Sequence, residues 1–238
     1  MNYAIIAAGE GSRLMQEGIA QPKPLVELNG EPMIHRLIRI FNANGAEQIA
    51  IVANDLYPET AEYVRKLMSE PFGKHCRLVV KSTPSSMHSF YALSSLLEEG
   101  PFCLTTVDTI FREEEFARYI ADFSITPYDG LMGVSDFIDD ERPLYVETGD
   151  HLMISDFGDT ATQDSIYISG GIYGLKPICL QTLQRCMAEG QHRMRNFQRG
   201  LIKDGRKLQA WPFSKVLDID HASDILKAEQ FLATDKAL

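Results

Sequence analysis

The residues best suited to chemistry lie near the start of the chain, in the stretch 3–25. Gly9 and Gly11 flank a tight turn, and backbone N–H groups in a glycine-rich turn can converge on an anion. Arg13 follows the turn directly, and Lys23 stands between two prolines. Arginine and lysine both offer charge-assisted hydrogen bonds to phosphate oxygens. The combination predicts a polyphosphate site.

Two common phosphate-binding loops do not match this turn. A dinucleotide-binding loop has the pattern G-x-G-x-x-G, and Leu14 stands where its third glycine would be. A P-loop requires Gly-Lys followed by Ser or Thr, and this stretch has no such run. The pattern that remains is a short apolar strand over 3–8, then Gly-Glu-Gly-Ser-Arg, then Gln-Pro-Lys-Pro-Leu.

This order resembles the opening signature, G-x-G-x-R followed by P-K-P-L, of nucleotidyltransferases that make nucleotide-sugars and related activated alcohols. The resemblance implies that Arg13 meets the β and γ phosphates of a nucleoside triphosphate (NTP). It also implies that Lys23 bridges phosphates at the reacting end, so these two are the expected catalytic residues. The strand end and the turn complete the expected nucleotide site, with Ala7, Ala8, Gly9, Gly11 and Ser12.

Acidic residues supply the candidate metal site. Asp108 follows the apolar run 102–107, and an acid at the end of a buried strand is seldom part of a core unless it is paired. The resemblance implies that Asp108 and Asp218 bind the catalytic Mg²⁺. Asp220 lies two residues further on, on the same side of an extended segment, and is expected to assist. The alternative for Asp108 is that it caps the following helix.

The nucleobase site is expected in the small polar connection 82–88. The resemblance places a base-binding turn here, which makes Ser85 and Ser86 the candidate contacts. Serine is also a common helix cap, so a purely structural role stays open for both residues.

The acceptor site is less well marked. The resemblance implies that a glycine-rich strand, here with Gly170 and Gly171, lets the acceptor dock closely, although paired glycines also mark a bulge. The stretch 155–160 contains no lysine where the family usually has Glu-Lys-Pro, so the acceptor contacts stay open. An arginine-rich run is either a solvated helix face or a source of one acceptor contact: Arg193, Arg195 and Arg199.

The elements that position these residues alternate between strand and helix. Apolar runs at 3–8, 49–53, 77–81 and 102–107 predict buried strands, and helices are expected to open at Glu31-Pro32 and to span 58–68, 89–97 and 112–120. This predicts an α/β fold, a Rossmann-like three-layer sandwich with a mainly parallel mixed sheet. Ligands in such sheets bind outside the carboxyl ends of the strands.

The second part of the chain changes character at residue 130. Short strands at 131–134, 144–147 and 152–154 predict a small antiparallel extension over the acceptor site. We expect one domain over 1–238, with a nucleotide-binding half at 1–125. The half at 126–238 would bind the acceptor and supply the closing metal segment.

Composition excludes several classes of protein. A net charge of −10 argues against a general nucleic-acid surface. No apolar run is long enough to span a membrane, and the N-terminus lacks the features of a secretory signal. The four cysteines show no C-x-x-C spacing, which favours reduced thiols in a cytoplasmic protein. We also expect no β-helical domain of the kind that the resemblance implies for bifunctional family members.

Together these features predict a Mg²⁺-dependent enzyme. It would transfer a nucleoside monophosphate from an NTP, expected to be a pyrimidine, to a sugar 1-phosphate or another small phosphomonoester and release pyrophosphate. One alternative is a molybdopterin guanylyltransferase-like enzyme. Another is a catalytically silent nucleotide-sensing or regulatory subunit. The joint presence of Arg13, Lys23, Asp108 and Asp218 argues against this second alternative. Homo-oligomerisation stays open.

Overall fold

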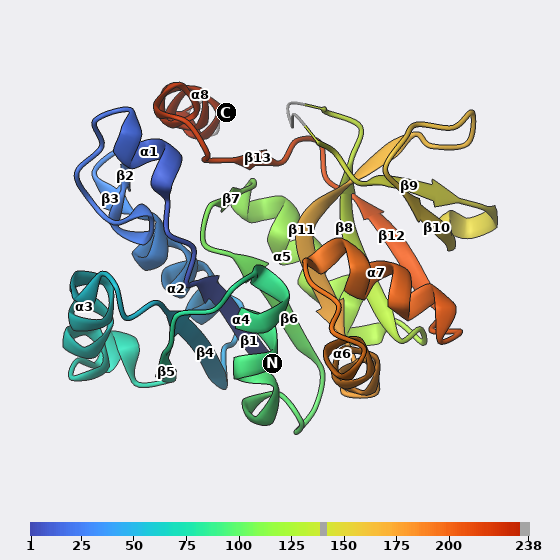
Figure 1. Cartoon of the computed structure of the whole chain (residues 1–238), viewed down its shortest axis with the longest axis horizontal. Helices are drawn as coiled ribbons and strands as arrows, with labels where there is room; N and C mark the ends of the chain where they lie inside the picture. The colour runs from blue at the N-terminus through green and yellow to red at the C-terminus, as the bar shows by residue number, and fades with distance from the viewer. Residues whose placement is uncertain (139–141, 234–238) are drawn as a thin grey trace.

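A nine-stranded mixed sheet runs through the molecule (Figure 1), and the computed structural model describes residues 1–138 and 142–233. Strands β6, β1, β4 and β5 are adjacent in this order and mutually parallel. Their bounds are β1 Asn2–Ala7, β4 Gln48–Ala53, β5 Cys76–Val80 and β6 Phe102–Thr106. These strands confirm the parallel sheet expected from the four apolar runs.

The other side of the sheet is mainly antiparallel. Strand β11 pairs antiparallel with β6, β8 and β9, and β10 continues antiparallel from β9. Strand β12 returns parallel to β8. The bounds are β8 Gly130–Ser135, β9 Tyr145–Thr148, β10 Ile154–Gly158, β11 Tyr167–Leu175 and β12 Leu208–Pro212. The predicted antiparallel extension is therefore present.

Helices cover both faces of the sheet, which gives three layers. Tyr3 and Ile5 of β1 pack into one core with α2, α3 and α5, whereas Ala4 and Ile6 pack into a second core with α4, α6 and α7. Burying each large apolar side chain contributes about 1.5–3 kcal/mol. The bounds are α2 Met33–Ala43, α3 Pro58–Met68, α4 Ser86–Leu93, α5 Glu113–Ile125, α6 Cys179–Ala188 and α7 Met194–Lys203.

Two expected helix starts are shifted. Glu31 and Pro32 form a short strand, β3 Glu31–Pro32, because they pair with β2 Glu27–Leu28 across the Asn29-Gly30 turn, so α2 starts at Met33. The helix expected from residue 89 begins three residues earlier, at Ser86. Within residues 1–138 and 142–233, no helix is both long and apolar enough to cross a membrane.

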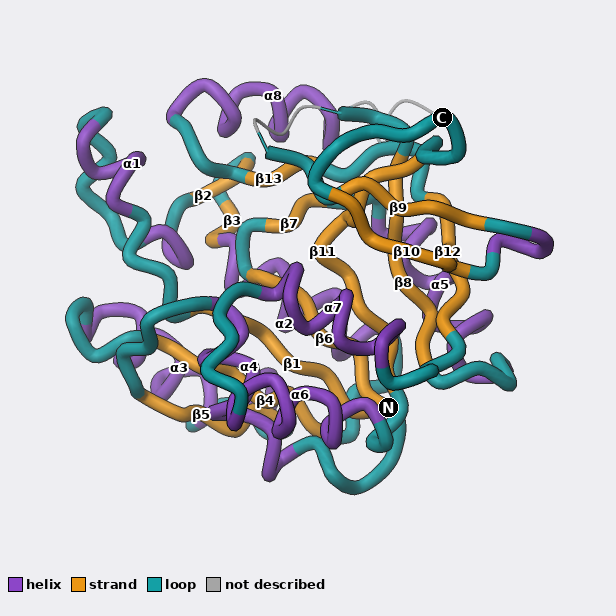
Figure 2. The backbone as a smooth tube through the Cα atoms, turned by 45° about the vertical axis from the view of Figure 1, so that its right-hand side comes forward, coloured by secondary structure: helices purple, strands orange, loops and turns teal. Residues whose placement is uncertain are grey.

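A small two-stranded sheet brings the end of the chain to the site. Strand β13 Leu217–Asp218 pairs antiparallel with β7 Thr109–Ile110, directly after β6 (Figure 2). The remaining helices are α1 Ser12–Gln16 and α8 Ala222–Ala233 and four 3₁₀ turns, Lys23–Leu25, Pro71–Gly73, Ser94–Leu96 and Asp150–Leu152. The division into halves at residue 125 stays a prediction.

Candidate active site

The glycine-rich loop that follows β1 leaves space for Lys23 to pack against it. Gly11 has φ of 64°, a conformation that side-chain-bearing residues rarely adopt. A Cβ atom on Gly11 would lie 2.8 Å from Cβ of Lys23, which is too close for an undisturbed contact. Gly11 therefore allows the Pro-Lys-Pro segment to pack directly against the loop, and its conformation also starts the short helix α1.

Lys23 is held between two carboxylates. Its ammonium group contacts Asp108 and lies 2.9 Å from Oδ1 of Asp220. The Lys23 side chain is only 10% exposed and that of Asp108 18%. This pairing meets the requirement that a buried strand-end acid should have a partner.

The ion pair dominates the protonation of both groups. Burial favours the uncharged form of Lys23, but attraction and hydrogen bonds from Asp108 and Asp220 outweigh it and raise the Lys23 pKa. Burial likewise favours the uncharged form of Asp108, and the charge and hydrogen bond of Lys23 reverse this effect, so the Asp108 pKa lies below its ordinary value. Both groups are therefore charged at neutral pH.

Arg13 joins the same group of charges. Its guanidinium donates to Oδ2 of Asp220 at 3.0 Å, so the two oxygens of Asp220 face two different cations. Arg13 and Asp220 are about half exposed, 54% and 49%, which leaves both accessible to a ligand.

A cavity of about 280 Å³ lies over this group. It is lined by Ile6, Gly9, Gly11, Ser12, Arg13, Lys23, Ser86, Thr106, Val107, Asp108 and Asp220. The structure thus brings the expected glycines, Ser12, Arg13 and Lys23 together with Asp108, which follows Lys23 by 85 positions in the chain, whereas Ala7 and Ala8 do not line the cavity. Backbone amides, two cations and a concave wall can hold an anionic ligand.

The two predicted metal ligands lie on neighbouring segments. Asp218 pairs with Thr109 in the β13–β7 ladder, and the Ile219 amide donates to the carbonyl of Asp108 at 3.2 Å. Carboxylate oxygens on two adjacent segments suit Mg²⁺, which prefers oxygen ligands and retains several waters. Among the residues with described positions, however, no three His, Cys, Asp or Glu side chains group as a metal cage.

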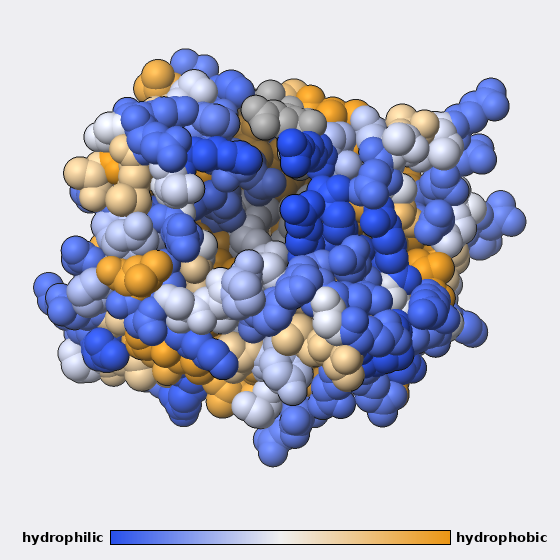
Figure 3. All heavy atoms as spheres, viewed as in Figure 1, coloured by the Kyte–Doolittle hydropathy of each residue, from blue (hydrophilic) through white to orange (hydrophobic). Residues whose placement is uncertain are grey.

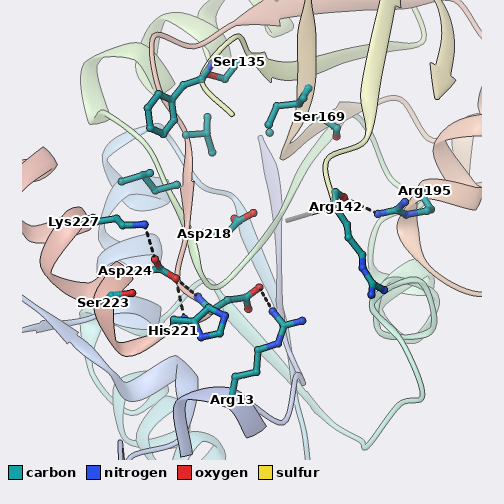
Figure 4. A pocket seen from close by; sticks show the side chains of 16 residues that line it. Arg13, Ser135, Arg142, Ser169, Arg195, Asp218, His221, Ser223, Asp224 and Lys227 are labelled. Atoms are coloured by element: carbon teal, nitrogen blue, oxygen red, sulfur yellow. Dashed lines mark hydrogen bonds and ion pairs between the residues drawn. The ribbon is translucent and has the colours of Figure 1, made fainter. Parts of the chain in front are cut away.

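A second cavity, of about 400 Å³, shares Arg13 and Asp220 with the first (Figure 4). Its cationic lining is supplied by Arg13, Arg142, Arg195 and Lys227. Asp218 and Gly170 also line it, together with Ser169 and His221. Figure 3 shows this face of the molecule as hollowed, with a mostly hydrophilic rim.

The paired glycines of β11 form a bulge beside the second cavity. The register of β11 against β8 shifts between Ser169 and Ile172. Gly171 has φ of 71°, and a Cβ on Gly170 would lie 3.1 Å from the carbonyl oxygen of Gly133. Gly170 lines the cavity, so the bulge and a role in acceptor docking are compatible.

The two candidate base-contacting serines have different positions. Ser86 lines the first cavity. Ser85 precedes α4, but its hydroxyl pairs with Nδ1 of His88 at 2.8 Å and does not cap a helix amide. Of the two, only Ser86 borders the first cavity.

The arginine-rich run supplies one cavity residue. Arg195 lines the second cavity, and its guanidinium is held by Asp159 at 2.5 Å and by the carbonyl of Arg142 at 3.0 Å. Arg199 pairs with the same Asp159 at 2.8 Å but does not line the cavity.

Sequence reasoning did not single out Arg142, Lys227 or His221 as site residues. Arg142 follows three acidic residues in the sequence, and Lys227 lies on α8, where it pairs with Asp224 at 3.2 Å. Neither residue stands in a pattern that distinguishes it from an ordinary surface cation. His221 could have been identified from its position, because it directly follows the candidate site residue Asp220.

Comparisons with known proteins agree with this geometry. A family model described as MobA-like NTP transferase domain matches residues 3–200. The 2-aminoethylphosphonate cytidylyltransferase of Lancefieldella rimae is 28% identical over 113 residues, which are 48% of this chain and 45% of that enzyme. The glucose-1-phosphate cytidylyltransferase of Salmonella typhimurium is 35% identical over 51 residues, 21% of this chain and 20% of that enzyme. The chain therefore spans less than half the length of these two relatives.

Solved structures share the whole fold. The inositol-1-phosphate CTP transferase from T. maritima superposes with a TM-score of 0.77 at 18% identity, covering 97% of both chains. A Bacillus anthracis protein assigned as a glucose-1-phosphate thymidylyltransferase reaches a TM-score of 0.83 at 18% identity, covering 97% of this chain and 94% of its own. The family match extends over the glycine-rich loop, Lys23, Asp108 and the β11 bulge, and the chain belongs to the MobA-like NTP transferase domain family.

Proposed function

We propose that this protein transfers a nucleoside monophosphate from a pyrimidine NTP to a small phosphomonoester or phosphonate and releases pyrophosphate. The observation that carries the proposal is the pair of cavities with a common wall of Arg13 and Asp220. One cavity contains the glycine-rich loop and Lys23, which suit a triphosphate. The other is lined by three arginines and one lysine beside three aspartates, and its cations can bind an anionic acceptor.

The choice of a pyrimidine nucleotide and of a small acceptor is supported by the relatives. Two curated relatives are cytidylyltransferases, acting on 2-aminoethylphosphonate and on glucose 1-phosphate. A third, from Thermococcus kodakarensis, is a bifunctional IPC transferase and DIPP synthase, 26% identical over 149 residues and covered over 29% of its length. Their acceptors define the panel of compounds to test.

The proposed reaction is an in-line displacement. An acceptor oxygen forms a bond to the α-phosphorus as the bond from that phosphorus to the bridging oxygen of the β-phosphate breaks, and pyrophosphate departs with the electron pair. The acceptor oxygen is already anionic at neutral pH, so no protein base is needed. Positioning and charge stabilisation then supply the catalysis.

The residues of the first cavity would have different roles in this reaction. Lys23, held rigidly between prolines and by Asp108, would stabilise charge that develops on the α-phosphate. Arg13, at the more exposed end, would hold the departing pyrophosphate. Asp108 and Asp218 would hold Mg²⁺, which when bound neutralises phosphate charge. The second cavity would orient the acceptor through Arg195 and the bulge at Gly170.

The cellular setting follows from general properties. We propose a cytoplasmic enzyme that does not bind nucleic acid, because the net charge is −10 and the four cysteines are buried free thiols.

The test is pyrophosphate release from a matrix of substrates. CTP, UTP, dTTP, ATP and GTP would each be combined with 2-aminoethylphosphonate, phosphocholine, glucose 1-phosphate and inositol 1-phosphate, in Mg²⁺ and in EDTA. We expect one pyrimidine nucleotide with one acceptor to dominate, only in Mg²⁺. The absence of release for every pair with a pyrimidine nucleotide would refute the proposal.

A second candidate is guanylyl transfer. It is favoured by the MobA-like description of the family and by a 29% identity over 113 residues to the mannose-1-phosphate guanyltransferase of Gibberella zeae, of which 31% is covered. The GTP arm of the matrix, extended with mannose 1-phosphate and molybdopterin, decides between the two.

A further inference from the structure

Asp220 occupies an unusual place in the site. Its Oδ1 lies 2.9 Å from the ammonium of Lys23, and its Oδ2 accepts from the guanidinium of Arg13 at 3.0 Å. The carboxylate therefore spans the two cations assigned above to the triphosphate. Two oxygens, each facing one cation, form the contact that two phosphate oxygens would form.

The backbone that carries Asp220 is held by other groups. Oδ2 of Asp224 accepts from the amides of Asp220 and His221, at 3.2 and 2.9 Å. Glu17, directly after α1, accepts from the amide of Ala222 at 2.6 Å and pairs with the His221 ring. These contacts hold the segment against the end of α1 without help from the Asp220 side chain, so that side chain can rotate while the backbone stays in place.

The Asp220 contacts are suited to replacement. The Asp220 side chain is 49% exposed and that of Arg13 54%, and ion pairs at such exposure add little to stability. Lys23 keeps a second carboxylate partner, Asp108, when Asp220 leaves. A triphosphate, with more negative charge, can therefore take the place of Asp220 at small cost to the fold.

We propose that Asp220 is an internal substitute for phosphate, which neutralises Arg13 and Lys23 in the ligand-free protein and is displaced by the incoming triphosphate. This inference rests on the proposed assignment of that cavity to a triphosphate. Asp220 then sets nucleotide affinity by competing for the two cations. Because it lines both cavities, its displacement also moves a negative charge at the wall of the acceptor cavity.

This role differs from that of a metal ligand, and the two can be separated. Removal of a metal ligand weakens binding of a metal–triphosphate complex in Mg²⁺, and in EDTA its effect is limited to the loss of one nearby negative charge. Removal of a competing carboxylate strengthens polyphosphate binding, most clearly in EDTA.

The experiment is calorimetric titration of inorganic tripolyphosphate, and then CTP, in EDTA into wild type, Asp220→Asn and Glu10→Gln. Glu10 is an exposed residue of the glycine-rich loop that does not line the cavity, so Glu10→Gln removes one nearby negative charge without touching the bridge. We expect tripolyphosphate to bind about tenfold more tightly to Asp220→Asn, or about 1.4 kcal/mol, and less than about twofold more tightly to Glu10→Gln. In the Lys23→Met/Arg13→Gln background, Asp220→Asn should bring no gain.

Several outcomes would overturn the inference: unchanged or weaker binding to Asp220→Asn, an equal gain in Glu10→Gln, or a gain that persists without the two cations. Asp220→Ser provides a second test if Asp220→Asn fails to show the circular dichroism spectrum of wild type. The proposed function fails separately, through the absence of pyrophosphate release by wild type. A tenfold gain in tripolyphosphate binding without turnover would support the bridge and reject the transferase.

Discussion

The two cavities of this protein are built in different ways. The first takes most of its charged groups from a continuous piece of chain, from Gly9 to Lys23, and from Asp108 just after β6, with Asp220 added from the end of the chain. Its central charges, Lys23 and Asp108, are nearly buried and paired with each other. The second is assembled from β8, β11, α7, β13 and α8, and its cations come from separate elements.

The difference has a chemical reason. A triphosphate presents the same chemistry in every NTP, so one compact and rigid loop can serve it. An acceptor differs between enzymes, and the cavity proposed for it is lined by side chains from several elements that can vary independently. Rigid contacts in the first cavity should therefore control turnover, whereas side chains of the second should control acceptor affinity.

The largest effect should come from Lys23→Met. Losing a charge that stabilises the transition state costs about 3 kcal/mol or more, so turnover should fall at least about a hundredfold. Stability should also fall, because Asp108 would be left buried without a partner. Steady-state kinetics and thermal unfolding measure the two losses.

The double variant Lys23→Met/Asp108→Asn separates these losses. It should regain stability while turnover stays lost; recovered turnover would contradict the role of Lys23.

The pKa shifts of Asp108 and Lys23 also make the stability of the fold depend on pH. The depressed Asp108 pKa stabilises the fold above the unfolded value, about 3.9, and this contribution is lost as pH falls through the folded pKa. The raised Lys23 pKa stabilises the fold below about 10.4, and this contribution is lost as pH rises through the folded pKa.

The next effect concerns the boundary between the cavities. Asp108→Asn and Asp218→Asn should each remove most activity and most of the Mg²⁺-dependent tightening of NTP binding, because the two acids are expected to hold one ion. The double variant should be hardly worse than either single one, since residues that act as a unit are non-additive. Calorimetry of NTP with and without Mg²⁺ tests this, and an undiminished Mg²⁺ effect in Asp108→Asn would reject the metal assignment.

A smaller effect is expected in the acceptor cavity. Arg195→Gln should raise the KM for the acceptor about tenfold and leave the KM for the NTP unchanged, because a hydrogen bond to a charged group contributes about 1.5–3 kcal/mol. Arg199→Gln is the matched control, since Arg199 pairs with the same Asp159 outside the cavity. Equal increases in the KM for the acceptor in both variants would show that the ion pairs with Asp159, and not a contact between Arg195 and the acceptor, cause the effect.

The smallest effect should distinguish the two serines. Ser86→Ala should raise the KM for the NTP by a few fold, consistent with the loss of one hydrogen bond of about 0.5–1.5 kcal/mol, with little change in kcat. Ser85→Ala should instead lower thermal stability slightly, because its hydroxyl pairs with His88. The opposite pattern would exchange the roles assigned to them.

Much of the fold followed from local patterns. Short apolar runs predicted β1, β4, β5 and β6, and helix α3 matched its expected range, 58–68. The predicted start of α2 was wrong. Glu31 pairs with Leu28 in a hairpin at Asn29-Gly30, and this pairing is a contact between strands and not a property of one segment.

The first cavity could be described from the sequence because its chemistry is concentrated there. Glycine at position 11, a lysine between prolines and an acid at the end of a buried run have few other physical explanations. The residue types themselves restrict the backbone and the charge at these places.

Tertiary structure alone decided the rest. Arg142 and Lys227 have no local pattern that distinguishes them from ordinary surface residues. Only the folded chain brings them together with Arg195 around one cavity. The bridge from Asp220 to Arg13 and Lys23 joins residues about 200 positions apart, through the pairing of β13 with β7. Such contacts depend on where distant segments meet in the fold, and no local pattern of residues encodes that position.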